Sequence, residues 1–336
     1  MLKPLIQKIT NKLSLTFDEA QSVANFMMTG EASPEDIKAF LLVLNTKGET
    51  VDEIAGFATA MRENMLALTP NVSGSMVDTC GTGADGLGTF NISTVVAFVV
   101  TGAGITVAKH GNRAISSKSG SADVLKELGV NINVSPEQAQ RQIEEIGMAF
   151  LFAPLFHPAM RHVEPVRKEL GVRTVFNILG PLCNPAGVKR QVIGVFSKNL
   201  LRPLAEVLKK LGSEHVLLVH GQDGGDEISL CGSTDVVELL PNGEIKEYIV
   251  SPSHFGLSIC KSEDIEGGDA VMNAGIAMDI LKRVSGPQLD IVLLNAAAVI
   301  YVSGLVDSLQ AGLKVARSSV ESGHAMKTLV FLQKFY

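Results

Sequence analysis

The sequence has few cysteines, and none of them are paired at a spacing that would bind a metal. Cys80, Cys183, Cys231 and Cys260 lie far apart, and no two form a CxxC motif. This spacing is typical neither of a zinc site nor of the disulfide framework of a small secreted protein. We therefore expect four reduced thiols in a cytoplasmic protein.

Long apolar runs are also lacking. The most apolar stretches, residues 95–108 and 291–302, contain Gly or Asn and fall short of the roughly 20 residues that span a bilayer. The first ten residues meet charged and polar side chains before an apolar signal core can form, so we expect no secretory signal. Both apolar stretches are expected to be buried core, without a membrane partner.

Positive charge is not in excess. The chain of 336 residues has 29 Lys and Arg against 35 Asp and Glu, a net charge of −6. Such a field opposes non-specific attraction to nucleic acid, and we expect no nucleic-acid partner. Because the net charge is negative, any anionic ligand must be held by local groups. The 46% of hydrophobic residues can fill a sizeable core.

The order of patterns predicts two domains. Residues 1–70 are expected to form a helical domain. Three segments there each begin with a Ser or Thr that can cap a helix N-terminus, followed by an acid three residues later. From residue 71 to 336, short apolar runs alternate with helical patterns, which predicts an α/β domain with a central, mostly parallel sheet flanked by helices. The caps are Thr16, Ser33 and Thr50, and the runs are residues 76–77, 105–108, 149–152, 192–196, 216–219 and 290–294.

Two further features belong to this organisation. A capped helix is expected to begin at Ser135, where Pro136 and Gln138 complete the cap pattern. Residues 155–185 are rich in Pro, His and Arg and show no strand alternation, so part of them is expected to rejoin the helical domain.

The first segment that suggests chemistry is residues 78–94, between a short apolar run and an apolar helix. Its glycines let the backbone approach an anion closely, and Thr89, Ser93 and Thr94 supply donors near a helix start. The segment therefore predicts phosphate binding, and the plain alternative is a glycine-rich turn.

The same segment contains a literal GxGxxG match at Gly81, Gly83 and Gly86. A NAD site would need an acid about 20 residues further on, where this chain has Lys109 and its basic neighbours instead. No Gly-Lys-Ser/Thr follows, so a Walker loop is excluded as well. A NAD-dependent oxidoreductase stays a disfavoured rival.

Two later segments complete a possible anion site. Residues 109–123 combine cations with hydroxyls in a glycine-containing loop, which predicts a second phosphate-binding wall, with a solvated basic turn as the alternative. Asp226 and Glu227 follow another apolar run, and such a pair suits Mg²⁺, which prefers one or two carboxylates together with phosphate oxygens. Adjacent acids are also common in solvated turns.

A fourth segment, residues 152–185, has a role that the residues alone leave open. Arg167 or Arg173 could bind a carboxylate, with aromatic and proline residues as an apolar wall. An interdomain hinge with ion pairs explains the same composition. For His157 and His162 the sequence favours neither a structural nor a catalytic role.

Taken in order, these motifs resemble those of the anthranilate phosphoribosyltransferase family of tryptophan biosynthesis. The resemblance covers nearly the whole chain and extends to residues 268–274 and 290–297. It implies a small helical domain, an α/β domain of the nucleoside phosphorylase type, Mg²⁺, and a homodimer formed through the helical domains. It also implies phosphoribosyl pyrophosphate as donor and anthranilate as acceptor. Ala84 departs from the family, which usually has Gly there, and we expect the added methyl group to be tolerated.

The resemblance also implies site residues. The magnesium positions are Ser93, Asp226 and Glu227, the anthranilate positions are Gly81, His110, Asn112, Arg167 and Pro181, and the catalytic positions are Lys109, Asn112 and Arg167. The donor positions are Gly81, Ala84, Asp85, Thr89, Asn91, Ile92, Ser93, Thr94, Lys109, His110, Gly111, Asn112, Arg113, Ser116, Ser117 and Ser121.

Two other rivals remain at this point. A nucleoside phosphorylase, or a phosphoribosyltransferase with another acceptor, would share the fold. A noncatalytic relative that binds nucleic acid is disfavoured by the charge and by the magnesium acids. Association with a separate glutamine amidotransferase subunit is left open.

Overall fold

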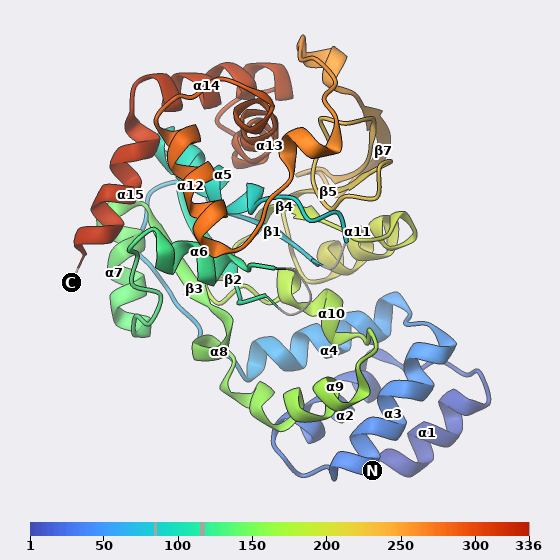
Figure 1. Ribbon diagram of the computed structural model, residues 1–336. Helices are drawn as coiled ribbons and strands as arrows, with labels where there is room; N and C mark the ends of the chain where they lie inside the picture. Colours follow the sequence, from blue (N-terminus) through green and yellow to red (C-terminus); the bar gives the residue numbers. More distant parts are fainter. Residues whose placement is uncertain (84–85, 115–117, 336) are drawn as a thin grey trace.

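A helical part and an α/β part make up the molecule. The computed structural model describes residues 1–83, 86–114 and 118–335. Figure 1 shows the N-terminal helices beneath the α/β part, with α9 beside them although it comes much later in the chain. The helical part contains α1 (Leu2–Thr10), α2 (Phe17–Met28), α3 (Pro34–Lys47), α4 (Val51–Glu63), the 3-10 turn η1 (Pro158–His162), α9 (Glu164–Leu170) and α10 (Phe176–Leu179).

The predicted helix starts in this part are confirmed. The side chains of Thr16, Ser33 and Thr50 each accept a hydrogen bond from the backbone N–H three residues on. At Thr16 and Thr50 the acid three residues on also accepts from the cap backbone, which completes a capping box. Later in the chain, α9 packs against α3, and η1 packs against α2. The boundary near residue 70 stays a prediction.

One sheet of seven strands forms the centre of the α/β part, in the order β3-β2-β1-β4-β5-β6-β7. Strands β3, β2, β1, β4 and β5 run parallel, and β6 and β7 add an antiparallel hairpin at one edge. The strands are β1 (Met76–Gly81), β2 (Thr106–Gly111), β3 (Met148–Phe152), β4 (Arg190–Gly194), β5 (His215–Gly221), β6 (Thr234–Leu239) and β7 (Ile245–Val250). The predicted fold class, a small helical domain with a mostly parallel α/β domain, is confirmed.

Helices cover both faces of this sheet. They are α5 (Ile92–Gly102), α6 (Ser121–Glu127), α7 (Pro136–Ile146), α8 (Ala153–Phe156), α11 (Leu201–Lys210), α12 (Ala270–Leu281), α13 (Pro287–Ser303), α14 (Leu309–Glu321) and α15 (His324–Lys334). The cap predicted at Ser135 is present at the start of α7. None of the helices in the described part of the chain has both the length and the apolar character needed to cross a membrane.

One sequence prediction about this part was wrong, and one pair of strands was missed. Residues 290–294 were expected to form a strand, but they lie inside α13. That helix is buried on almost every side, so its apolar residues show no clear helical periodicity. A short apolar segment of such a helix cannot be told from a buried strand by its sequence pattern. The hairpin of β6 and β7 was missed because its paired partners are visible only in the folded sheet.

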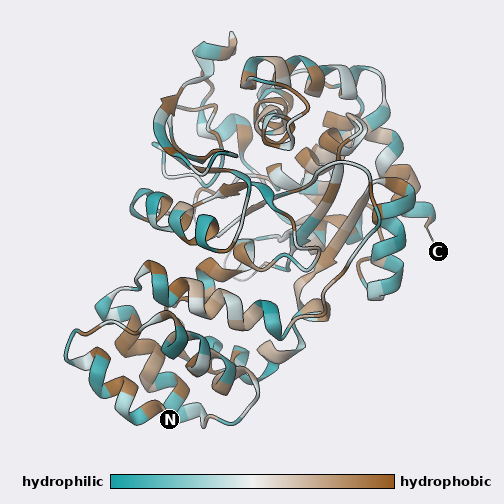
Figure 2. Cartoon of the chain, turned by 180° about the vertical axis from the view of Figure 1, so that it is seen from behind, coloured by the Kyte–Doolittle hydropathy of each residue, from teal (hydrophilic) through white to brown (hydrophobic). Residues whose placement is uncertain are grey.

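Alternating residues of the strands feed two main cores. On β5, Leu217 and Val219 pack into the core formed with α5 and α13, whereas Val216 and Leu218 pack into a core continuous with the helical part. Figure 2, seen from behind, shows hydrophobic colour along the central strands. The helical part and one face of the sheet therefore share one continuous core.

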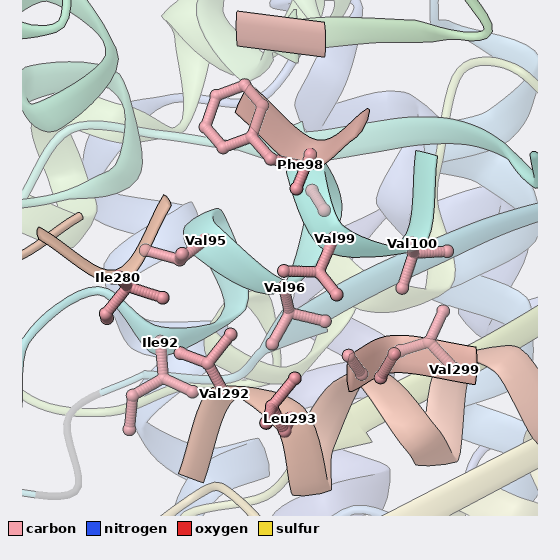
Figure 3. Close-up of a cluster of buried hydrophobic side chains, with 14 of the residues drawn as sticks. Ile92, Val95, Val96, Phe98, Val99, Val100, Ile280, Val292, Leu293 and Val299 are labelled. Atoms are coloured by element: carbon pink, nitrogen blue, oxygen red, sulfur yellow. The ribbon is translucent and has the colours of Figure 1, made fainter. Parts of the chain in front are cut away.

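The first of these cores holds α5 firmly in place. Val96 of α5 lies close to Leu293 of α13, and Val95 lies beside Ile280 of α12 (Figure 3). All four side chains are at most 1% exposed. A helix packed so completely is a rigid support for the loop at its N-terminus.

The sheet topology marks one place as a candidate site. The chain leaves β1 for β2 on one side and returns to β4 on the other, so the strand order reverses between β1 and β4. In open α/β sheets, ligands bind outside the carboxyl ends of the strands at such a switch point. The loops that follow β1, β2 and β5 lie at this edge.

Candidate functional site

A buried lysine lies under the loop that follows β1. Lys109 is on β2, which extends through Gly111, and its side chain is only 1% exposed. Its Nζ donates to the carbonyl of Thr79 at 2.6 Å and to Ser93 Oγ at 3.2 Å. Burial lowers the pKa of Lys109, while the negative charge of Asp78 opposes that shift. Lys109 thus orients the Ser93 hydroxyl from below.

The carboxylate of Asp78 joins three segments of the site. It is fully buried, and it accepts from the backbone N–H of His110 at 3.3 Å and from Asn184 Nδ2 at 2.8 Å. The same Asn184 nitrogen donates to the carbonyl of Ala108 at 2.8 Å. Burial raises the pKa of Asp78. Sequence reasoning gave neither Asp78 nor Asn184 a role, because their partners are more than 30 residues away.

The loop after β1 is held by a segment from far along the chain. The backbone N–H of Phe90 donates to the carbonyl of Ile265 at 3.4 Å, and that of Gly267 donates to the carbonyl of Gly88 at 2.9 Å. Thr89 lies between them and forms a bridge with Glu266. The predicted donor residue Thr89 is therefore fixed by two flanking backbone bonds.

Asn91 connects this loop to the next one. Its Nδ2 donates to the carbonyl of Ser119 at 3.2 Å, and its Oδ1 accepts from Asn273 Nδ2 at 2.9 Å. Asn273 in turn accepts from the backbone N–H of Gly268 at 2.7 Å. Asn273 is in the C-terminal motif that supported the family resemblance, which was the only sequence signal for its position here.

The loop after β2 presents polar groups at its rim. Asn112 and Arg113 are exposed, and the carbonyl of Asn112 accepts from Ser121 Oγ at 3.2 Å. Asp123 fixes the end of the loop by accepting from the backbone N–H groups of Gly120 and Ala114. The predicted residues Ala84, Asp85, Ser116 and Ser117 lie outside the described part of the chain.

Like Lys109, the predicted donor residues Thr94 and Ile92 are buried. Thr94 is fully buried, and its Oγ1 has no hydrogen-bond partner among the described residues. The side chain of Ile92 belongs to the core, and its backbone N–H donates to the carbonyl of Phe90. Their side chains support the loop from within the protein.

The acid loop after β5 packs directly on the ends of β1 and β4. Asp226 Oδ2 accepts from the backbone N–H of Gly83 at 3.0 Å. A Cβ atom on Gly81 would lie 2.5 Å from that oxygen, and one on Gly194 would overlap the carbonyl oxygen of Asp226. Glycine at both positions is therefore needed for the acids to approach the loop after β1.

Asn295 of α13 holds the other end of this acid loop. It is 1% exposed, and its side-chain amide accepts from the N–H of Ile228 at 2.9 Å and donates to the carbonyl of Ile228 at 3.0 Å. Ile228 directly follows Glu227, so a rigid core helix fixes the acid pair. Like Asn273, this asparagine was quoted in the resemblance without a role.

The acid pair fits magnesium better than a metal held entirely by protein. Asp226 and Glu227 are half-exposed neighbours, and the half-exposed Ser93 in the first turn of α5 offers a hydroxyl. The described residues contain no group of three or more His, Cys, Asp or Glu that could hold a metal. An all-oxygen set with two carboxylates is what Mg²⁺ uses when a phosphorylated substrate supplies the remaining ligands.

Two buried histidines lie on the other side of β2. His110 Nδ1 lies 3.1 Å from the carbonyl of Gly180, and His110 Nε2 lies 3.2 Å from His157 Nε2. Since the carbonyl of Gly180 can only accept, a neutral His110 donates from Nδ1 and accepts at Nε2 from His157. Pro181 follows Gly180 and is buried beside this pair. The structure thus joins His157, whose role was open, to the predicted acceptor residues His110 and Pro181.

Both histidines are neutral near pH 7. Burial lowers the pKa of His110 to about 3 and that of His157 to about 4, from an ordinary value of 6.5. The proximity of His157 adds to the shift at His110, whereas the Gly180 carbonyl opposes it. Imidazoles with such low pKa values are weak bases, which favours positioning over proton transfer.

We expect this pair to make the protein sensitive to acid. Below pH 6.5 the unfolded chain binds protons that the folded His110 and His157 do not, so stability falls as pH drops toward about 4. In His157→Gln, the loss of unfolding free energy between about pH 7 and pH 4.5 should be smaller by on the order of 2 kcal/mol. Urea unfolding at each pH measures it, and parallel curves for the two proteins would contradict the expectation.

The predicted arginines belong to the helical part. Arg167 is on α9, with its guanidinium 5.6 Å from the centre of the Phe176 ring, and burial lowers its pKa. Arg173 lies over the Phe196 ring at 4.0 Å. His162 receives a hydrogen bond from Arg161 Nε and lies away from the histidine pair. Arg167 is thus positioned by α9 and not by the loops of the sheet.

Comparison with known proteins gives one consistent result. A family model described as the glycosyl transferase family a/b domain matches residues 73–326, and one described as its helical bundle domain matches residues 3–65. An anthranilate phosphoribosyltransferase of Thermoanaerobacter is 51% identical over 335 residues, covering 100% of this chain and 98% of the relative.

Solved structures agree. The anthranilate phosphoribosyltransferase of Thermus thermophilus is 44% identical with a TM-score of 0.92, and 98% of each chain is covered. That of Saccharomyces cerevisiae, in complex with PRPP and Mg, is 28% identical with a TM-score of 0.89, covering 98% of this chain and 97% of the other.

Proposed function

Because this chain belongs to the anthranilate phosphoribosyltransferase family, we propose that it transfers 5-phosphoribose from phosphoribosyl pyrophosphate to the amine of anthranilate. The products are N-(5-phosphoribosyl)anthranilate and pyrophosphate, in tryptophan biosynthesis. The observation that carries the proposal is the switch point of the sheet, where two loops rich in glycine and polar groups face an acid pair across β1 and β4.

We propose that the donor lies between the loops after β1 and β2. Ser93 at the start of α5 supplies a hydroxyl, and Asn112 and Arg113 supply exposed polar groups on the facing rim. The cross-connection through Asn91 fixes the spacing of the two loops before the donor arrives. The other donor positions are Gly81, Ala84, Asp85, Thr89, Ile92, Thr94, Lys109, His110, Gly111, Ser116, Ser117 and Ser121.

Asp226, Glu227 and Ser93 are the residues that would hold magnesium. When bound, magnesium would supply positive charge that offsets the negative charge of the pyrophosphate leaving group. The backbone N–H of Gly83 donates to Asp226, and Asn295 accepts from and donates to the backbone of Ile228, so the acid loop is held and its carboxylates are oriented before the substrate binds. The complex of the yeast relative with PRPP and Mg supports the use of magnesium.

Anthranilate is proposed to lie against the histidine pair, between the sheet and α9. Arg167 reads its carboxylate, and the buried surface of Pro181 and His110 packs against its ring. Gly81 and Asn112 complete the acceptor positions. Since the guanidinium of Arg167 is partly buried over Phe176, a carboxylate there would be bound in a poorly solvated place, which strengthens a charged hydrogen bond.

The main contribution of the protein to the reaction is positioning. The amine nitrogen attacks C1 of the ribose while the bond from C1 to the pyrophosphate oxygen breaks, with inversion at C1. The proton that the nitrogen then loses passes to the departing pyrophosphate or to water. The neutral histidines are too weakly basic to act as a general base, and little acid–base catalysis is needed at the ribose. Holding both substrates in one crevice can contribute on the order of 7 to 11 kcal/mol when the geometry is ideal.

The finer assignments about the molecule as a whole are also proposals. We propose a homodimer formed through the helical parts, where Leu13 and Leu42 are 57% and 39% exposed. We also propose a cytoplasmic enzyme, a domain boundary near residue 70, and possible pairing with a separate glutamine amidotransferase. Light scattering of the pure protein would test the dimer.

The fluorescence of anthranilate provides the direct test of turnover. We expect the fluorescence to fall only when enzyme, phosphoribosyl pyrophosphate and magnesium are all present. If calorimetry detected no binding of phosphoribosyl pyrophosphate and no turnover were seen, the proposal would be overturned. Donor binding without turnover would retain the phosphate site and assign the enzyme a different acceptor.

A further inference from the structure

Two of the four cysteines are in contact, although they are 29 residues apart in the chain. Cys231 Sγ and Cys260 Sγ lie 3.5 Å from each other. Both thiols are reduced and half-exposed, so a small reagent can reach them. The other two cysteines differ, because Cys183 is buried in the core of the helical part and Cys80 is on β1.

The backbone around the pair suits a disulfide. The N–H of Cys260 donates to the carbonyl of Leu230 at 3.2 Å, so the two chain segments run side by side. A disulfide needs its sulfurs about 2.0 Å apart, and the two sulfurs here already lie within 3.5 Å of each other. Rotation of the two side chains can bring the sulfurs to bonding distance.

The pair lies between the two segments that frame the donor site. Cys231 follows the acid pair by four residues, and its N–H donates to Ser229 Oγ at 2.9 Å. Ser229 in turn donates to Asp223, at the start of the acid loop. Cys260 leads into residues 265–267, whose backbone bonds hold residues 88–90 of the loop after β1.

We propose that Cys231 and Cys260 form a reversible intramolecular disulfide when the protein meets a low-molecular-weight disulfide such as oxidised glutathione. The Cys231 thiolate attacks one glutathione sulfur, which forms a mixed disulfide and releases one glutathione thiolate. Cys260 then attacks the Cys231 sulfur and releases the second. The two protons of the protein thiols end on the two reduced glutathione molecules, so two thiols are oxidised and one disulfide is reduced.

The residues around the two thiols control their pKa values and therefore the rate of oxidation. Burial raises the pKa of both thiols, that of Cys260 to about 12, and the nearby negative charge of Asp264 adds to both shifts. Asp223 and Glu263 act on Cys231 in the same direction, whereas its hydrogen bond with Cys260 opposes the rise. Cys231 is therefore the thiol that ionises first, and oxidation should be slow at neutral pH and faster at alkaline pH.

The test exposes the full-length protein to oxidised glutathione at about pH 9, where thiolate is more abundant. We expect the thiols titrated in denaturant to fall from four to two and the protein to become lighter by two hydrogen atoms. The melting temperature should rise by about 5 °C, and dithiothreitol should reverse all three changes. Four remaining thiols, or stable glutathione adducts without a cross-link, would overturn the proposal.

Matched variants assign the bond. Cys260→Ser can form only a glutathione adduct at Cys231, whereas Cys183→Ser should still form the cross-link. The effect on the site rests on the proposed function: oxidation should change the KM for phosphoribosyl pyrophosphate by at least about twofold in the wild type and not in Cys260→Ser. An unchanged KM with the disulfide present would overturn the link to the donor site but not the bond itself.

Discussion

The double substitution Asp226→Asn with Glu227→Gln is expected to lower magnesium-dependent kcat/KM by about 10³-fold. Both replacements keep the size of the side chain and remove its charge, so the acid loop keeps its hydrogen bond to Gly83. Without the two carboxylates, the chain would hold magnesium only through Ser93 and the donor. Steady-state kinetics over a range of magnesium concentrations measures the loss.

A matched control separates this loss from a general effect of charge. Glu144 and Glu145 are another adjacent pair of acids, on the exposed face of α7. Glu144→Gln with Glu145→Gln changes the net charge by the same amount and should leave kcat/KM within about twofold, because these acids lie outside the site. Full activity in the Asp226 and Glu227 variant, with an unchanged melting temperature, would place the metal elsewhere.

Arg167→Ala is expected to raise the KM for anthranilate by roughly 10- to 100-fold while the affinity for the donor stays near normal. A hydrogen bond between two charged groups contributes about 1.5 to 3 kcal/mol, which corresponds to that range. Arg167 lies on α9 and packs over Phe176, so the substitution acts on the acceptor side of the crevice. Calorimetry with phosphoribosyl pyrophosphate and initial rates with varied anthranilate measure the two affinities.

Arg173→Ala is the natural control for this variant. Arg173 comes from the same segment and also packs over an aromatic ring, that of Phe196, but the resemblance gives it no acceptor role. We expect its anthranilate KM to change by less than about threefold. If Arg173→Ala raised KM more than Arg167→Ala, the carboxylate would be bound by Arg173; an equal loss of donor binding in Arg167→Ala would refute the acceptor role.

The sequence predicted best what depends on near neighbours. The capped starts of α2, α3, α4 and α7 were correct because a cap and its partner lie three residues apart. The α/β class was correct because each parallel strand shows its own apolar run before a helical pattern. Residues 290–294 failed for the converse reason, since a helix buried all round has no polar face to reveal its period.

The site followed from the topology, but the residues that support it did not. Loops after parallel strands meet at one edge, so the phosphate loops and the acid pair could be placed together from the sequence. Asn184, Asn273 and Asn295 were given no role because their hydrogen bonds connect segments more than 60 residues apart. Their function is visible only when buried polar groups are matched with their partners in the folded chain.

The same limit applies to the cysteines. The sequence contains no CxxC motif, but spacing along the chain could not show that Cys231 and Cys260 lie in contact. The β6–β7 hairpin lies between the two cysteines and brings the chain back beside the segment that precedes it. No local pattern around either cysteine predicts this contact.

The bond formed in the reaction is the most direct test of the proposed function. Phosphoribosyl pyrophosphate labelled with ¹³C at C1 and anthranilate labelled with ¹⁵N would be incubated with the enzyme and magnesium and followed by NMR. The expected result is a one-bond coupling between ¹³C and ¹⁵N that grows as the donor signal falls. Consumption of the donor without that coupling, or a donor signal that does not change, would contradict transfer to the anthranilate amine.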